Sequence, residues 1–358
     1  MRIAVLGVGL IGGSIGLAAR ERVTGARVVG WGPRPGTVEK ARARGAVDAV
    51  AGTVAEAVSD ADAVFACGPV ETLPDLVRQA LAAAPADCVV TDVGSTKRPL
   101  VEAVDDQRFV GGHPIAGAET AGVDHARPEL FDSAAWYLTP RADTSGILYE
   151  RLHRLIVAFG ARPTAIDAAT HDRMLAAVSH LPHVLANVLV TQAAGAVAEG
   201  EPLPRTGPSF RDATRVAGAN SDIWTGIYLT NRDAIAAEID AVVERLGAVA
   251  GALRDADAGA VRAWNETARE DRRRLLESGL EGAQVRELRL SVPNRPGIVA
   301  QVALALGKAG VNIADMALAP APDMRSGSMT LWVAGGDEAE RARRLIEELG
   351  FPAALVAE

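Results

Sequence analysis

The chain has 358 residues, of which 49% are hydrophobic and 23% charged, the composition of a globular protein with room for two or three domains. Its formal net charge of −8 argues against a nucleic-acid partner, which would need clustered lysine and arginine to neutralise phosphates. The two cysteines have no CxxC spacing, so we expect neither a disulfide framework nor a zinc site, and a reducing cytoplasm fits.

Strand-like apolar segments alternate with helix-like segments rich in Ala, Arg and Glu as far as about residue 167. Alternation of this kind predicts an α/β fold with a mostly parallel, doubly wound sheet, the Rossmann arrangement. We therefore expect a dinucleotide-binding domain over residues 1–167. Its predicted strands are residues 3–6, 26–31, 63–66, 88–91, 109–110 and 136–138.

The first predicted strand runs into a glycine-rich turn, Gly7-Val-Gly9-Leu-Ile-Gly12, that opens a helix. In this context GxGxxG predicts a dinucleotide site. Gly7 permits the tight turn, Gly9 lets the backbone approach a pyrophosphate, and Gly12 lets the helix pack on the strand. The alternative is that the glycines only make a strand-to-helix turn. The further predicted cofactor contacts are Leu10, Ile11, Gly68, Pro69 and Asp92.

The second predicted strand bears on the choice of cofactor. About twenty residues past the glycine turn, an NAD-binding unit usually carries an acid for the ribose 2′-hydroxyl. This chain has Trp31-Gly32-Pro33-Arg34 there, with no acid. Because arginine attracts a 2′-phosphate that a carboxylate would repel, Arg34 favours NADP, while NAD stays open. The alternative is that Arg34 is simply exposed to solvent.

Two further segments follow predicted strands and so lie at the carboxyl edge of the sheet, where ligands bind. They are Thr91-Asp-Val-Gly-Ser-Thr-Lys97 and Gly111-Gly-His-Pro-Ile-Ala-Gly-Ala-Glu119. Loss of a hydride from an alcohol leaves a proton to be removed, and a histidine that titrates near neutrality suits that role. His113 is therefore the candidate catalytic residue, and a buried structural histidine is the alternative.

From residue 168 to about residue 281 the pattern favours helices only, with a Pro- and Gly-rich break at residues 201–208. This stretch is the second predicted domain. If the segment Phe210-Arg-Asp-Ala-Thr-Arg215 is helical, Arg211 and Arg215 share one face of it. An exposed ion-pair face that includes Asp212 is the alternative.

Three histidines fall in this helical part. We expect His180 to be structural, because it lies near Pro182 at a helix kink or start, and His171 to be a cap or pocket residue. A metal site built from His180 and His183 is not expected, because no third ligand lies at a suitable spacing.

No segment has the pattern of an export signal or a membrane span. The chain opens directly on a strand pattern, without the basic and apolar regions of a secretory signal. The most apolar stretch, residues 184–198, carries three polar residues and falls short of the roughly 20 residues that a span needs. We expect a buried helix there, no membrane partner and a cytoplasmic location.

A short polar segment with two glycines, residues 277–284, predicts a linker to a third domain over residues 285–358. The pattern beyond it predicts a ferredoxin-like βαββαβ arrangement. Pro296 at the start of its first helix and Gly310 just past the end of that helix fit the usual asymmetry. The predicted elements are residues 286–292, 296–308, 311–318, 327–333, 338–349 and 353–356.

Five motifs in order resemble the prephenate/arogenate dehydrogenase family of tyrosine biosynthesis. They are GVGLIGGS, TDVGSTK, GGHPIAGAE, SHLPH and FRDATR, with Trp224 downstream, and they span residues 1–280. The last domain, with Pro293-Asn-Arg-Pro-Gly297 and Gly310-Val-Asn-Ile313, looks like an ACT domain, an amino-acid-sensing module.

The resemblance implies a role for each matching residue. His113 would hydrogen-bond the C4 hydroxyl of a cyclohexadiene and polarise it for hydride transfer, and Ser95 would orient both. Arg215 would bind a substrate carboxylate, which suits the planar fork of arginine. The residues expected to line, shape or gate the substrate pocket are His183, Arg211, Asp212 and Glu119.

The reaction that follows from the resemblance is oxidative decarboxylation of prephenate to 4-hydroxyphenylpyruvate with NAD(P)+, without a metal. Arogenate, which would give tyrosine directly, is the alternative substrate. A lysine-dependent β-hydroxyacid dehydrogenase or imine reductase is disfavoured, because residues 168–281 contain no lysine. A non-catalytic sensor of NADP and amino acids is the remaining alternative. The resemblance also implies a homodimer built through the helical domain, and a tyrosine effector at the last domain.

Overall fold

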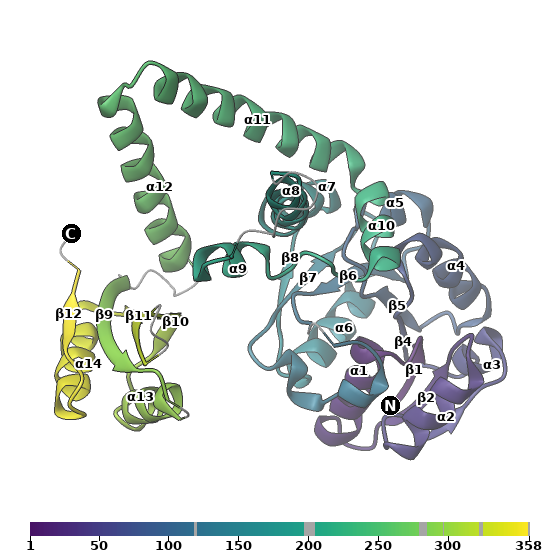
Figure 1. Ribbon diagram of the computed structural model, residues 1–358. Coiled ribbons are helices and arrows are strands. Elements are labelled where there is room, and N and C mark those ends of the chain that lie inside the picture. Colours follow the sequence, from purple (N-terminus) through teal and green to yellow (C-terminus); the bar gives the residue numbers. More distant parts are fainter. Residues whose placement is uncertain (118–119, 197–204, 279–284, 296, 322–324, 357–358) are drawn as a thin grey trace. The chain divides into compact units, whose positions relative to one another are not determined.

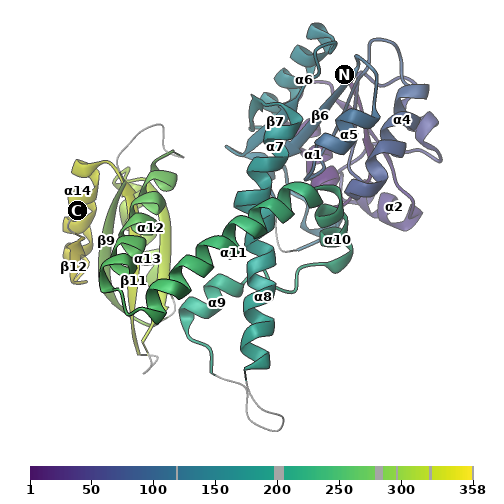
Figure 2. The same cartoon turned by 90° about the horizontal axis from the view of Figure 1, so that it is seen from above.

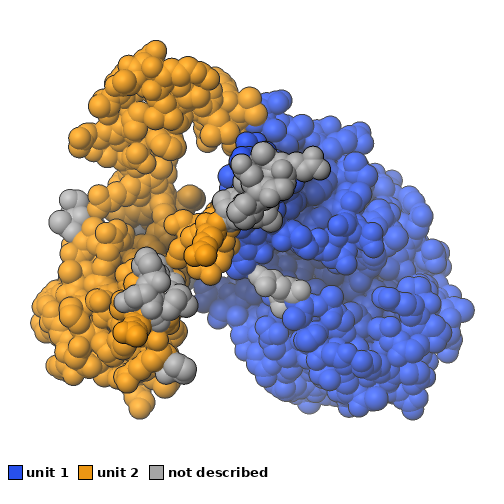
Figure 3. Space-filling view, viewed as in Figure 1, with its two compact units in different colours: residues 1–204, 214–241 blue, residues 205–213, 242–358 orange. Residues whose placement is uncertain are grey.

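The computed structural model describes residues 1–117, 120–196, 205–278, 285–295, 297–321 and 325–356. The chain divides into two compact units, coloured separately in Figure 3. The first unit contains residues 1–204 and 214–241, and the second contains residues 205–213 and 242–358. Each unit is described by itself below.

An eight-stranded sheet forms the centre of the first unit (Figure 1). Its order is β3-β2-β1-β4-β5-β6-β7-β8, and all neighbours are parallel except β6 and β7, so the predicted Rossmann-like sheet is confirmed. Sequence reasoning located six of the strands and missed β3 and β8. The strands are β1 (Arg2–Leu6), β2 (Arg27–Trp31), β3 (Ala49–Val50), β4 (Ala63–Ala66), β5 (Val89–Asp92), β6 (Phe109–Pro114), β7 (Ala135–Thr139) and β8 (Arg162–Ala165).

Helices cover both faces of this sheet, and the residues of β1 show why. Ile3 and Val5 are buried in one hydrophobic cluster, while Ala4 and Leu6 are buried in another on the opposite face. Because successive side chains of a strand alternate between faces, a strand that is apolar throughout must be covered on both sides. The covering helices are α1 (Leu10–Arg22), α2 (Pro35–Ala43), α3 (Val54–Val58), α4 (Leu73–Ala83), α5 (Arg98–Ala103) and α6 (Gly146–Ala158).

Only helices follow the sheet as far as Ser278 in the described residues, as predicted. The helix α7 (Ala168–Leu175) continues through a π-helical turn, Ala176–His180, into α8 (Leu181–Gly195). Pro182 cannot donate a backbone hydrogen bond, and the wider π turn accommodates this loss without breaking the helix. The remaining helices here are α9 (Pro208–Thr214), α10 (Ser221–Thr230), α11 (Arg232–Arg254) and α12 (Ala258–Ser278).

The expectation that residues 184–198 form a buried helix is wrong for the single chain. In α8 only Leu181 and Ala186 are buried, while Val188, Leu189 and Val190 are exposed. Apolar composition predicts that a helix is covered but not which chain covers it. The continuous helix Ala168–Gly195 is also the one described segment long and apolar enough to cross a membrane by length and composition, with 28% of its most apolar window buried.

A four-stranded antiparallel sheet with the order β10-β11-β9-β12 dominates the second unit. The predicted βαββαβ order is confirmed, and Gly310 follows the first helix with a φ of +75° that favours glycine. The predicted helix start at Pro296 lies outside the described residues. The elements are β9 (Val285–Pro293), α13 (Ile298–Lys308), β10 (Ile313–Pro320), β11 (Ser326–Ala334), α14 (Gly336–Glu348) and β12 (Ala353–Leu355).

Candidate active site

The glycine turn lies where the strand order reverses, between β1 and β4 (Figure 1). Figure 2 shows the same unit from above, with α1, which the turn opens, beside the sheet. Gly7 has a φ of +106°, and a Cβ there would collide with the carbonyl of Cys67. A Cβ on Gly12 would likewise collide with the carbonyl of Gly7, whereas a Cβ on Gly9 would meet no atom within 4 Å. Gly7 and Gly12 are thus required by the fold, and Gly9 leaves the N-terminus of α1 open. These residues fit the pyrophosphate of a dinucleotide at a switch point.

The other predicted cofactor contacts lie at the same carboxyl edge of the sheet. Leu10 and Ile11 are half-buried in the first turn of α1, and Gly68 and Pro69 follow β4 directly. Arg34, just after β2, is exposed at the start of α2. The connection from β2 to α2 consists of Gly32, Pro33 and Arg34 and contains no acid.

Asp92, at the end of β5, is fully buried, and its carboxylate is bound by other groups of the same chain. It accepts hydrogen bonds from the backbone N–H groups of Gly94 (2.7 Å) and Gly112 (3.0 Å), and it forms a buried ion pair with Lys97. These bonds tie the end of β5 to the segment of β6 that carries His113. Asp92 therefore has a structural task, besides the cofactor contact predicted for it.

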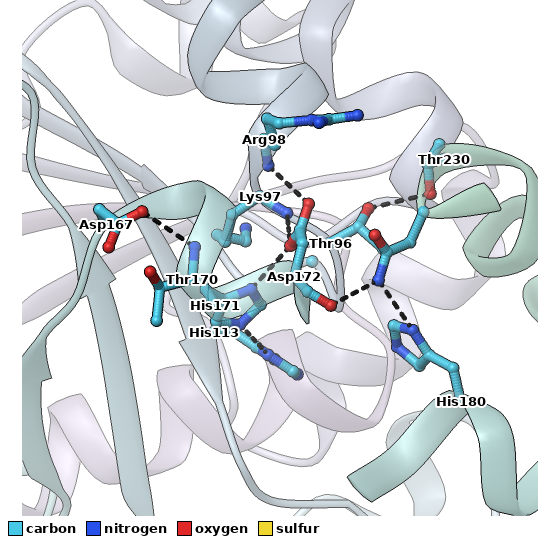
Figure 4. Close-up of polar contacts among 12 residues, drawn as sticks. Thr96, Lys97, Arg98, His113, Asp167, Thr170, His171, Asp172, His180 and Thr230 are labelled. Carbon is cyan, nitrogen blue, oxygen red and sulfur yellow. Dashed lines mark hydrogen bonds and ion pairs between the residues drawn. The ribbon is translucent and has the colours of Figure 1, made fainter. Parts of the chain in front are cut away.

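A chain of buried polar side chains connects β6 with α7, and Figure 4 shows it. The Nδ1 atom of His113 lies 2.9 Å from Nε2 of His171, and Nδ1 of His171 lies 2.8 Å from the Asp172 carboxylate. Asp172 also accepts from the backbone N–H groups of Lys97 (2.8 Å) and Arg98 (2.9 Å), which begin α5. We call His113, His171 and Asp172 the histidine relay. It joins the candidate catalytic residue to the loop that holds Ser95.

A second histidine contacts the same region through Asn231. The Asn231 amide nitrogen donates to the carbonyl of Asp172 (2.8 Å) and to Nδ1 of His180 (3.1 Å). The buried Nε2 atom of His180 has no hydrogen-bond partner among the described residues. His180, which we expected to be purely structural, thus belongs to the network around Asp172.

Burial and neighbouring charges act on both of these histidines. Burial, and then His171, Lys97 and His180, hold the pKa of His113 well below its ordinary value of 6.5. Burial lowers the pKa of His180 to about 4, against the opposing effect of Asp172. Both rings are therefore neutral at neutral pH, and a neutral His113 can accept a proton.

Two of the predicted substrate-binding residues, His183 and Arg215, lie with aromatic side chains in a second group in the same unit. His183 stacks on Trp224 with ring centroids 3.5 Å apart, and Tyr228 lies beside that indole at 5.4 Å. Burial and then the positive charge of Arg215 lower the pKa of His183. An arginine, a histidine and two aromatic rings are thus gathered in one place.

The remaining predicted site residues are distributed as follows. Ser95 is half-buried in the loop between β5 and α5. Arg211 and Asp212 lie on α9 in the second unit, and Glu119 lies outside the described residues. The segment is helical as α9 up to Thr214, and Arg215 follows directly in a turn, so the shared face of Arg211 and Arg215 stays a prediction.

Sequence reasoning did not assign Asp172, Lys97 or Asn231 to the site, and it left His171 undecided. One usable signal was Lys97 itself, one of only three lysines among 37 basic residues, placed in the loop that follows β5. The described residues contain no group of three or more His, Cys, Asp or Glu side chains that could hold a metal ion.

Comparison with known proteins gives consistent matches. Residues 15–164 match the family model of the prephenate dehydrogenase nucleotide-binding domain, and residues 167–266 match that of its dimerization domain. Prephenate dehydrogenase of Bacillus subtilis is 29% identical over 96% of this chain and 95% of its own. Cyclohexadienyl dehydrogenase of Zymomonas mobilis is 31% identical over 71% of this chain and 89% of its own.

A solved structure is similar as well. Prephenate dehydrogenase of A. aeolicus, crystallised with hydroxyphenyl propionate and NAD+, superposes with a TM-score of 0.71 at 27% identity. The match covers 76% of this chain and 97% of that one.

Proposed function

Because this chain belongs to the prephenate dehydrogenase family, we propose that it catalyses oxidative decarboxylation of prephenate to 4-hydroxyphenylpyruvate with a nicotinamide cofactor. The observation that carries this proposal is a neutral, buried His113 at the carboxyl edge of the sheet that the glycine turn of β1 also faces. A base placed at that edge is what removal of a hydride from an alcohol carbon requires.

In this reaction the C4–H bond of the substrate breaks, and the nicotinamide, when bound, supplies the acceptor for the hydride. The bond between C1 and its carboxylate then breaks, CO2 leaves, and the electron pair enters the ring, which becomes aromatic. His113 holds the C4 hydroxyl proton during the oxidation and returns it to the phenolate oxygen of the product. Aromatisation drives the reaction, so the task of the protein is positioning and proton handling.

Recognition of the dianionic substrate falls to cationic and aromatic side chains. We assign a substrate carboxylate to Arg215, and we place His183 in the same pocket, since the two are close enough for the charge of one to lower the pKa of the other. Ser95 orients the hydroxyl, while Arg211, Asp212 and Glu119 shape or gate the pocket. These assignments rest on the resemblance of the motifs and on this grouping.

The preferred cofactor is NADP in our proposal, on the strength of Arg34 and the missing acid after β2. Arogenate stays as the alternative substrate, because we identify no described residue that distinguishes its amino group from the keto group of prephenate. Absorbance at 340 nm, with both substrates crossed against both cofactors, tests the two choices together. A strong preference for arogenate would overturn the choice of substrate, and a strong preference for NAD would overturn the choice of cofactor. Absence of turnover in all four assays would overturn the function.

The other parts of the chain receive roles consistent with this function. We propose domains over residues 1–167, 168–281 and 285–358, with a homodimer formed through the helical part, whose apolar α8 is exposed in the single chain. We identify the ferredoxin-like last domain as an ACT domain that binds tyrosine. A cytoplasmic location fits two cysteines that are both free.

A further inference from the structure

The histidine relay is buried along its whole length. The exposed fractions are 8% for His113, 0% for His171 and 2% for Asp172, so bulk water does not compete for these bonds. Every ring nitrogen of His171 is engaged, Nδ1 by Asp172 and Nε2 by His113. A neutral imidazole has one N–H donor and one acceptor nitrogen, so the partner on one side decides what the ring does on the other.

The direction of the relay follows from Asp172. The backbone N–H groups of Lys97 and Arg98 can only donate, so each carboxylate oxygen of Asp172 already acts as an acceptor. The remaining partner, Nδ1 of His171, must then carry a proton and donate it to the carboxylate. A neutral imidazole that carries its proton on Nδ1 has a lone pair on Nε2, which can only accept. Nδ1 of His113 must therefore carry the proton that it donates to His171.

We propose that His171 and Asp172 are positioning residues that fix His113 in the tautomer protonated at Nδ1, leaving Nε2 as the one nitrogen able to take the C4 hydroxyl proton. This inference rests on the proposed function for the identity of the proton. When Nε2 accepts that proton, His113 becomes an imidazolium whose Nδ1–H still donates to His171. No proton moves along the relay, and the proton on Nε2 returns to the phenolate oxygen of the product.

The contacts of the other buried histidine, His180, favour the opposite tautomer. Nδ1 of His180 faces the Asn231 amide, which is a donor because its other contact is the Asp172 carbonyl. Neutral His180 therefore carries its proton on Nε2. The two histidines should be held in opposite tautomers, and each serves as an internal reference for the other.

Nitrogen-15 NMR of the full chain labelled at histidine measures this directly, because protonated and unprotonated ring nitrogens differ clearly in chemical shift. The resonances are assigned with His113→Asn and His180→Gln. We expect His113 to be protonated at Nδ1 and His180 at Nε2 at neutral pH. A proton on Nε2 of His113 would overturn the inference, whether or not the protein turns over prephenate.

A pair of variants at His171 tests the consequence for catalysis. His171→Phe removes both relay bonds, whereas the amide of His171→Gln can donate to Asp172 and accept from His113. We expect kcat to fall about 100-fold in the phenylalanine variant, which is the low end of what a general base contributes, while the KM for the cofactor changes little. In the glutamine variant we expect kcat to recover in large part. His125→Gln, at an exposed histidine, is the matched control.

The outcomes separate the relay from the function. Wild-type kcat in His171→Phe would overturn the relay and leave the proposed function standing. If the phenylalanine variant loses its native circular dichroism spectrum, the relay is still tested by the tautomer measured on the wild type and by kcat of His171→Gln. Absence of turnover in the wild type, with the expected tautomers, would overturn the function alone.

Discussion

The two histidines that connect to Asp172 differ in which ring nitrogen the chain leaves free, and this difference has chemical consequences. His113 presents an acceptor and His180 presents a donor, although both rings are neutral and buried. An unprotonated ring nitrogen can take a proton from a hydroxyl group. A protonated ring nitrogen can only donate a hydrogen bond to an oxygen atom. Of the two, only His113 has the arrangement of a base.

Replacement of His113 tests this directly. We expect His113→Asn to lower kcat by about 10²- to 10⁴-fold, the usual contribution of a general base, because the asparagine amide cannot take the hydroxyl proton. Cofactor affinity, measured by fluorescence titration with NADPH, should stay close to that of the wild type. Near-normal turnover in this variant would refute the catalytic assignment.

His180 predicts how stability depends on pH. Its pKa is 6.5 in an ordinary environment and about 4 in the folded chain, so between these values the unfolded chain binds more protons. The free energy of unfolding should therefore fall as pH drops through this window, by about 2 kcal/mol between pH 7.5 and pH 5 for this one group. Urea unfolding at the two pH values measures it.

In His180→Gln the part of this pH dependence that belongs to His180 should disappear, since the glutamine amide does not titrate. His125→Gln should keep the wild-type dependence, because that histidine is exposed. An identical dependence in the wild type and in His180→Gln would contradict the low pKa of His180.

Arg34 carries the cofactor preference in our proposal. In Arg34→Asp the new carboxylate would repel a 2′-phosphate and could accept from a ribose 2′-hydroxyl. We expect the ratio of kcat/KM for NADP to that for NAD to fall at least about tenfold, which corresponds to about 1.4 kcal/mol. An unchanged ratio would show that the exposed guanidinium does not meet the cofactor.

Residue-scale reasoning from sequence offered candidates where a motif carries the signal and offered none where contacts are distant in the chain. His113 lies in a glycine-rich motif at the carboxyl end of β6 and could be singled out. Its partner His171 is 58 residues away, and Asn231 is 59 residues from Asp172. The sequence shows no pattern that pairs them, since only the fold brings α7 and α10 to the end of β6.

At the scale of elements, periodicity located the buried strands and missed those with little buried surface. β4 is apolar throughout and β1 is apolar from Ile3 to Leu6, because helices cover both of their faces. β3 has two residues, and β8 contains Pro163 and is largely exposed. Short or proline-containing edge strands carry little hydrophobic signal.

The exposed face of α8 predicts the behaviour of the assembly. Leu189 is 44% exposed in the single chain, among apolar neighbours on the same helix. A charge there would be buried in a dimer formed through this helix, and each lost leucine contact would cost about 1.5–3 kcal/mol, twice over in a two-fold interface. We expect Leu189→Glu to weaken dimerization by at least about 100-fold in analytical ultracentrifugation.

The matched control is Val157→Glu on α6, where the valine is 50% exposed and lies outside the proposed interface. It should leave the sedimentation of the wild type unchanged. Equal sedimentation of both variants would mean that α8 does not form the interface, and its apolar face would then need another explanation.

At the scale of the whole molecule, the second unit has the features of a module with its own stability. Leu288, Val302, Leu331 and Ile346 are fully buried in a core that this unit supplies by itself. Within the unit, Arg272 of α12 lies 4.0 Å over the Trp332 ring and 3.3 Å from the Asp315 carboxylate. The sheet is thus joined to the helix that precedes it in the chain by a specific contact.

That contact would connect the proposed tyrosine site physically to α12, because a change in the sheet would alter the packing of that helix. We expect tyrosine to change the initial rate of the full-length chain, and to have no effect on a chain that ends at Glu281. Prephenate turnover without tyrosine should persist in the shorter chain, since the relay, the glycine turn and the group around His183 all lie before that residue. Identical responses of the two chains to tyrosine would count against sensing by the last domain. If full-length Arg272→Gln still binds tyrosine in calorimetry but no longer changes its rate, the α12 contact is the route by which tyrosine binding affects turnover.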